Sequence, residues 1–214
     1  MASAEVKAEQ EKITKEKCTS DPNFAVVCAF IERFGSICGM DISLGIVNYK
    51  IFPGKYLIGN YSYFLGVLCP SILRLQELLE DNNDVKDELI LFHVKLLRKL
   101  KKSVSLDKWE RFVTKFAHTY SSSDGWELER FGYKRAKLNL KLRLLKNLLE
   151  AQFDGNVKFK AEINTKDADD LRMEPLGRDK LGNLYWYQVD GDASMRVYKD
   201  DPEEETWELV AQNR

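Results

Sequence analysis

The sequence lacks the motifs that mark most enzymes. It contains no glycine-rich phosphate loop, no His-Glu-x-x-His metal motif, no nucleophile elbow and no pair of carboxylates on a plausible scaffold. Its two histidines, His93 and His118, are better explained as surface or boundary side chains, because a catalytic histidine needs a positioned partner. We therefore predict a protein that is not an enzyme, binds no metal or other cofactor and takes no small-molecule substrate.

Cysteine is also scarce. The four cysteines, Cys18, Cys28, Cys38 and Cys69, have no Cys-x-x-Cys spacing and no pairing with the histidines, so neither a zinc site nor a redox motif is present. We expect reduced thiols of an intracellular protein. The first residues alternate in charge and contain no apolar run, which excludes a secretory signal, and the sequence predicts a disordered or frayed tail over 1–19.

Long uncharged runs are equally rare. One, over residues 56–73, approaches the length of a membrane span. Gly59, Asn60, Gly66 and Pro70 interrupt it, and a soluble domain is expected on either side, so a span is disfavoured. Membrane association through residues 45–69 stays open only as a rival interpretation.

Charge of either sign is plentiful but unevenly distributed. The 214 residues carry 33 Lys and Arg against 34 Asp and Glu, a formal net charge of −1. Residues 1–85 sum to −3, residues 86–146 to +9 and residues 147–214 to −7. A basic middle followed by an acidic end indicates charged macromolecular partners, and a hydrophobic content of 44% is enough to bury a core.

Helical periodicity dominates the chain up to about residue 153. Apolar residues recur at helical spacing after Pro22, Pro70, Asp84, Ser105 and Lys137, each of which lies at or near an expected helix start. The predicted helices cover residues 22–34, 70–80, 84–102, 105–120 and 137–153, with Ser121 to Gly125 ending the fourth. Beyond residue 167 the pattern alternates and predicts strands over 183–189, 195–198 and 207–210, with Asp190-Gly191 as a hairpin turn. The fold class is therefore mainly α, a helical bundle closed by a small antiparallel β meander at the C-terminal end.

Three stretches of the sequence, in order, resemble one family. They are the opening block at residues 21–35, scattered matches through 88–154 and the block at 171–187. The last block is the most specific, because it contains a Gly-x-Asp signature, Gly177 and Asp179, followed by Tyr-Trp-Tyr at 185–187. The chain resembles the N-terminal portion of the large subunit of the remodeling and spacing factor, which has a DDT domain followed by WHIM motifs.

The resemblance implies a domain organisation. It predicts a DDT-like helical domain over 20–120 with an insertion at 45–69, a first WHIM-like helical motif over 121–165, and a second WHIM-like motif with the β meander over 166–214. The stretches before and after the insertion join cleanly to the family pattern, which favours a looped-out segment, with a retained intron as one explanation. Family members usually continue into a histone-reading finger, and no Cys and His cluster for one occurs here.

The resemblance also implies a function: a nuclear, non-catalytic accessory subunit of an ISWI-type chromatin remodeling complex, which supports nucleosome assembly, spacing and transcription regulation. By motif position, Gly177, Asp179, Tyr185 and Tyr187 would bind the ISWI-type ATPase. Asp179 has a second interpretation as a turn residue between two strands, where Asp is favoured for its side-chain hydrogen bonds. Trp186 is expected to point into the core.

The second implied partner is linker DNA or the nucleosome. The basic face of the fifth predicted helix, together with the basic residues just before that helix, would contact DNA phosphates without reading the base sequence. Its members are Lys134, Arg135, Lys137, Lys141, Arg143 and Lys146. This face also has a plainer interpretation as a solvated helix surface. An autonomous linker-DNA-binding protein that works without the ATPase remains the alternative function.

Overall fold

Helices occupy the chain up to residue 171 and strands follow. The computed structural model describes residues 17–40, 70–81, 84–100, 103–189 and 195–213. Within these ranges the elements are η1 (Cys18–Ser20), α2 (Pro22–Phe34), α3 (Ile72–Glu80), α4 (Asp87–Lys99), η2 (Leu106–Lys108), α5 (Trp109–Tyr120), α6 (Ser122–Arg135), α7 (Leu138–Gly155), α8 (Val157–Ile163), α9 (Ala168–Leu171), β1 (Gly177–Arg178), β2 (Leu184–Val189), β3 (Met195–Asp201) and β4 (Thr206–Gln212). The predicted fold class, mainly α with a C-terminal meander, is confirmed.

The first long helix begins at the predicted residue, and the second begins two residues after the predicted start at Pro70. The Asp21 carboxylate accepts a hydrogen bond from the Asn23 amide at 2.8 Å, and Pro22 occupies the first helical position of α2. The Ser71 hydroxyl accepts from the Arg74 amide at 3.2 Å and so caps α3. The order begins earlier than the predicted tail allows, because Cys18 and Thr19 in η1 are already buried.

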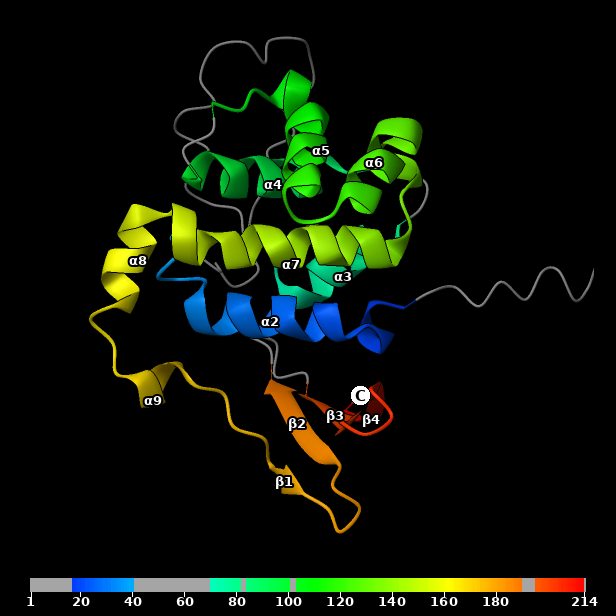
Figure 1. Ribbon diagram of the computed structural model, residues 1–214, viewed down its shortest axis with the longest axis vertical. Coiled ribbons are helices and arrows are strands. Elements are labelled where there is room, and N and C mark those ends of the chain that lie inside the picture. The colour runs from blue at the N-terminus through cyan, green and yellow to red at the C-terminus, as the bar shows by residue number, and fades with distance from the viewer. Residues whose placement is uncertain (1–16, 41–69, 82–83, 101–102, 190–194, 214) are drawn as a thin grey trace, which may run out of the picture.

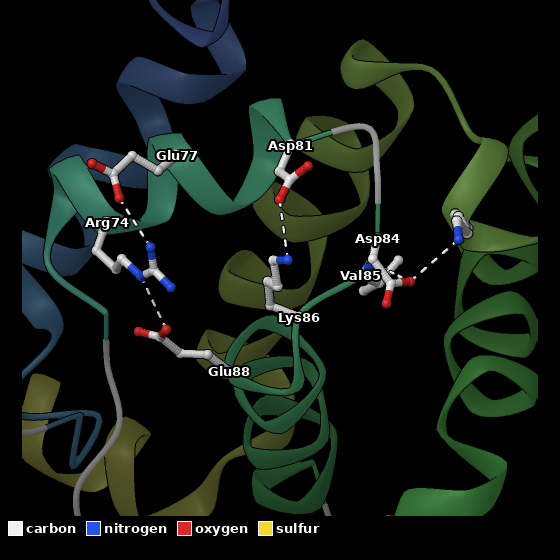
Figure 2. A network of polar contacts seen from close by, with 8 residues as sticks. Arg74, Glu77, Asp81, Asp84, Val85, Lys86 and Glu88 are labelled. Atoms are coloured by element: carbon white, nitrogen blue, oxygen red, sulfur yellow. Dashed lines mark hydrogen bonds and ion pairs between the residues drawn. The ribbon is translucent and has the colours of Figure 1, made fainter. Parts of the chain in front are cut away.

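The start of α4 corrects one prediction. The sequence suggests that Asp84 caps this helix, whereas α4 begins at Asp87 without a side-chain cap. The Asp84 carboxylate instead accepts from the Val85 amide at 3.0 Å and pairs with the Lys134 ammonium at 3.3 Å. Figure 2 shows Asp84 within a polar network between α3 and α4, in which Arg74 lies 3.0 Å from Glu77 and 3.0 Å from Glu88.

Helix α6 corrects a second prediction. The sequence predicts that Ser121 to Gly125 end one helix and lead into a short segment. Helix α5 does end at Tyr120, but the Ser121 hydroxyl accepts from the Asp124 amide at 3.2 Å and caps a new helix that includes Ser122 to Gly125. Serine and aspartate are common both in loops and at helix starts, so this stretch was compatible with either structure. Gly132 interrupts α6 with a φ of +75°, and a Cβ there would lie 3.0 Å from the Glu110 carboxylate, which accepts from the Tyr133 amide.

All the long helices share one core. In Figure 1, α7 runs through the middle of the bundle with α2 alongside it and with α4, α5 and α6 on its other side. Phe30, Phe34, Phe153 and Phe159 join α2, α7 and α8 through edge and tilted ring contacts at 5.1 to 6.1 Å between centroids. Because buried residues from Cys18 to Ile163 form one cluster, the expected division at residue 120 is not a break in packing.

The sheet lies against α2 on the side away from α7 (Figure 1). Its antiparallel order is β1-β2-β3-β4, and Trp186 faces Tyr198 across β2 and β3 while Asp200 faces Trp207 across β3 and β4. The Gln188 amide of β2 donates to the Ala25 carbonyl of α2 at 2.6 Å. Strand β1 and helices α8 and α9 are additional to the predicted elements, and the predicted Asp190-Gly191 turn lies outside the described residues.

Three of the four cysteines, Cys18, Cys28 and Cys38, are buried and form no disulfide, and Cys69 lies outside the described ranges. Over the parts of the chain that the structure describes, no helix is both long and apolar enough to cross a membrane. The segment 45–69, on which the rival membrane interpretation rests, is outside those parts.

The environment of His93 corrects a third prediction. The sequence places this residue at a surface or boundary, yet the side chain is fully buried between α4, α5 and α6. Its Nδ1 lies 2.8 Å from the Leu89 carbonyl oxygen and its Nε2 lies 3.3 Å from the Tyr133 hydroxyl. Nδ1 therefore carries the proton, and burial lowers the pKa of His93 to about 4. His118, paired at 3.1 Å with Glu129, lies at the boundary as expected.

This burial predicts sensitivity to acid. Unfolded His93 takes up a proton near its ordinary pKa of 6.5, whereas the native side chain resists until about pH 4. The unfolded state therefore binds more protons over this window, and the free energy of unfolding should fall by about 3 kcal/mol between pH 7 and pH 4 through this residue. Urea unfolding of His93→Phe at several pH values should lack this component, and His118→Gln should keep it. Equal pH dependence in wild type and His93→Phe would contradict the prediction.

Candidate functional site

The Gly-x-Asp signature forms the turn between β1 and β2. Gly177 pairs with Tyr185 across the two strands, and Arg178 pairs with Leu184. The Asp179 amide donates to the Asn183 carbonyl at 3.0 Å, and Gly182 completes the turn with a φ of +94°, which only glycine adopts without strain. The motif is therefore a hairpin-forming sequence, as the turn interpretation predicts.

The Asp179 carboxylate organises this turn. One oxygen accepts from the amides of Leu181 at 2.8 Å and Asn183 at 3.0 Å, and the other accepts from the Asn183 side chain at 2.8 Å and the Tyr185 hydroxyl at 3.2 Å. These bonds favour the charged form and hold the pKa of Asp179 below its usual value. A carboxylate offers about four acceptor sites, so this one is fully used within the turn.

The hairpin presents apolar side chains to solvent. Leu181 at its tip is 82% exposed, Leu176 before β1 is 61% exposed, and Tyr187 on β2 is 49% exposed. A Cβ added at Gly177 would meet no atom within 4 Å, so this glycine leaves the surface beside β1 open. Sequence reasoning missed Leu176 and Leu181, although two leucines beside a polar turn are a visible signal for an exposed binding surface.

The predicted basic face is divided by the structure. Lys141 is not on a solvated face: its side chain is buried, its ammonium lies 5.6 Å from the centre of the Tyr133 ring, and burial lowers its pKa. Arg143 is engaged by Asp124, with Nε at 3.0 Å from one oxygen and a terminal nitrogen at 2.7 Å from the other. Lys146 pairs with Glu150 at 3.5 Å.

The remaining cations gather where α6 passes into α7. Lys134, Arg135 and Lys137 are exposed, although Lys134 also pairs with Asp84. The last turns of α6 add Arg130 and Phe131, which the sequence prediction did not include. The Arg130 guanidinium lies 5.4 Å from the centre of the half-exposed Phe131 ring. We call Arg130, Phe131, Lys134, Arg135 and Lys137 the junction patch. Lys134, Arg135 and Lys137 were predicted from the sequence, whereas Arg130 and Phe131 were not, because Gly132 interrupts α6 between them and the predicted face.

The described residues hold no group of His, Cys, Asp and Glu arranged for a metal ion. The hairpin surface is apolar and lies beside the acidic side chain of Asp179, and the junction patch is basic.

Comparison with known proteins identifies the relationship. Over 198 residues, 91% of the chain, the sequence is 39% identical to human Remodeling and spacing factor 1, and it spans 12% of the length of that protein. The predicted resemblance is confirmed, and the chain belongs to the remodeling and spacing factor 1 family. No family model matches the chain. No solved structure matches it either.

The Arg143 and Asp124 pair leads to a prediction about stability. The Asp124 side chain is 5% exposed and would be left without its cation in Arg143→Gln, while the Arg143 side chain is 39% exposed, so solvent screens part of the interaction. We expect Arg143→Gln to lower the free energy of unfolding by about 1–3 kcal/mol, measured by urea denaturation. The exposed Arg135→Gln should change it by less than about 0.5 kcal/mol. Equal stability of both variants would contradict a structural role for Arg143.

Proposed function

We propose that this chain is a non-catalytic accessory subunit of an ISWI-type chromatin remodeling complex, which acts in the nucleus to support nucleosome assembly, spacing and transcription regulation. The observation that carries the proposal is the 39% identity over 91% of the chain to a protein named as a remodeling and spacing factor. The confirmed helical bundle with its C-terminal meander supports it, since this is the fold class that the family resemblance predicts.

The ATPase is proposed to bind the β1–β2 hairpin. Gly177, Asp179, Tyr185 and Tyr187 belong to this hairpin, and Tyr187 has half of its surface available to a partner. The Asp179 carboxylate is already hydrogen-bonded within the turn, to the amides of Leu181 and Asn183. Its contribution to ATPase binding is therefore to fix the conformation of the turn that presents Leu181 and to place a negative charge beside it. Tyr185 acts with it by donating its hydroxyl to that carboxylate.

Binding of the purified C-terminal region of an ISWI-type ATPase tests this. Asp179→Ala removes the acceptor for two turn amides, so we expect weaker binding together with faster hydrogen exchange of the Leu181 and Asn183 amides. Asp179→Asn keeps one oxygen for these amides and should retain more of the binding than Asp179→Ala.

Tyr187→Ala isolates the partner contact from the turn. We expect affinity for the ATPase fragment to fall about fivefold or more, because aromatic side chains dominate protein interfaces. Phe131→Ala is the matched control, since Phe131 is an equally exposed aromatic residue on α6. Undiminished binding by both Asp179→Ala and Tyr187→Ala would refute the proposed ATPase surface.

Linker DNA is proposed to lie against the junction patch. The charge of the predicted basic face is concentrated there, because Lys141 is buried and Arg143 and Lys146 are paired with acids. Contacts from Lys134, Arg135 and Lys137 to phosphates would position the protein on the duplex without reading its sequence. Arg130, beside Phe131, extends the same surface.

The salt dependence of binding to a duplex measures these contacts. Log K falls with log salt, and each lost phosphate contact reduces the steepness of this fall by about 0.9. Arg135→Gln combined with Lys137→Gln should therefore reduce the steepness by about 2. Lys158→Gln combined with Lys160→Gln is the matched control, because both lysines are exposed on α8 and the net charge changes equally. A slope that falls equally in both double variants would contradict a localised DNA surface.

A further inference from the structure

A groove lies between α2 and the face of the sheet that packs on it. The wall on α2 consists of Pro22, Ala25, Val26 and Ala29, and the sheet contributes Trp186, Gln188, Tyr198 and Trp207 from three neighbouring strands, with Asp200 at the same face. Its volume is about 240 Å³, and its lining is almost wholly apolar. A protein cavity of roughly 150 Å³ already admits a benzene-sized group, so this groove has room for a large apolar side chain.

The groove is open to an incoming chain. Val26 on α2 and Met173, in the segment after α9, are each 40% exposed at its edges, while Trp186 and Trp207 are half-buried. Tyr198 forms the floor and stacks on Trp207 at 4.9 Å between ring centres. A buried floor with apolar, partly exposed walls is the arrangement of an anchor pocket, in which one inserted side chain is desolvated.

Polar atoms in the lining have no partner. The Gln188 side-chain oxygen, the Tyr198 hydroxyl and the Trp207 indole nitrogen are all buried and make no hydrogen bond within the described residues. These atoms have almost no exposed surface, so they lie beneath the apolar lining, where a ligand in the groove does not reach them. The groove therefore offers mainly apolar contact, which suits an inserted apolar side chain.

The surroundings of the groove are acidic. The Asp200 carboxylate lies in the lining and accepts from the Trp186 indole at 3.3 Å. The turn that connects β3 to β4, between Asp200 and Trp207, carries the exposed Glu203, Glu204 and Glu205. Clustered negative charge around an apolar groove attracts a segment whose residues beside the anchor are basic.

We propose that this groove docks a partner-protein segment that inserts one large apolar side chain between α2 and the sheet and places Lys or Arg residues beside Asp200 and the acidic turn. The groove lies on the opposite face of β2 from Tyr185 and is distinct from the turn held by Asp179. Although Tyr187 is among its lining residues, the proposal does not depend on binding of the ATPase by the hairpin. Its test uses a peptide alone, so failure of either proposal leaves the other intact.

The probe is a short synthetic peptide with one central leucine flanked on each side by Lys and Arg. Titration calorimetry with the full chain should show binding, and replacing the leucine by serine should weaken it about tenfold or more, because a buried leucine side chain is lost. Replacing the flanking cations by glutamate should abolish it. Equal affinity for the leucine and serine peptides would overturn the proposed anchor pocket.

Variants of the chain locate the site. Val26→Arg places a bulky cation at the groove edge and should remove binding, whereas Val157→Arg, at an exposed valine of α8, should leave it unchanged. Asp200→Asn keeps an acceptor for the Trp186 indole but removes the charge, and should weaken binding severalfold at low salt. Glu208→Gln makes the same charge change on the other face of β4 and should have less effect.

Two outcomes would overturn the proposal. Peptide binding that survives Val26→Arg would place the peptide elsewhere. Self-association of the wild-type chain that Val26→Arg abolishes, seen by analytical ultracentrifugation without peptide, would show that a second copy fills the groove instead.

Discussion

Helix α2 packs against two different layers, the helical bundle on one side and the sheet on the other, and the arrangement of the molecule depends on these two contacts. Phe24, Val27 and Ile31 face the bundle and are fully buried beside α7. The other side meets the sheet, where the carbonyl of Ala25 accepts the hydrogen bond from Gln188. A helix enclosed on one side only would leave the aromatic face of the sheet without support, and the groove is bounded on this second side of α2 by the small residues Ala25 and Ala29.

Charge is used in two ways in this chain. Some cations stabilise the fold: Arg143 neutralises the buried Asp124, and Lys141 covers the ring of Tyr133. Others, such as Arg135 and Lys137, are exposed at the junction of α6 and α7. A run of basic letters does not distinguish the two uses, because the distinction depends on whether a tertiary partner lies within a few ångströms.

Much of the fold could be predicted from the sequence because local signals and packing agree there. Asp21 and Pro22 start α2 as predicted, and the alternation predicted over 183–189 and 195–198 falls in β2 and β3. Predictions failed where a local pattern had two meanings or where tertiary structure decided. Ser121 ends α5 as predicted but also caps α6, which was not predicted as a helix. His93 is buried because α5 and α6 close over it, which no periodicity within α4 reports.

The candidate site was predictable in its motif but not in its chemistry. Gly177 and Asp179 stand out as a signature, yet only the four hydrogen bonds to the Asp179 carboxylate show that it serves the turn. The groove could not be foreseen, because it is formed by residues from α2, β2, β3 and β4 that meet only in three dimensions.

The link between Ala25 and Gln188 joins residues 163 positions apart, and Arg33 similarly donates to the Arg172 carbonyl across 139 positions. During synthesis, α2 therefore emerges long before the strands that cover its second side. The nascent chain has to carry an exposed apolar strip over Ala25, Val26 and Ala29 until β2 to β4 are made, a period in which helical packing with α7 is already available. A shortened product that ends before residue 184 lacks β2 to β4 and leaves this strip exposed, in the manner of the apolar surfaces that make partly folded chains prone to aggregation.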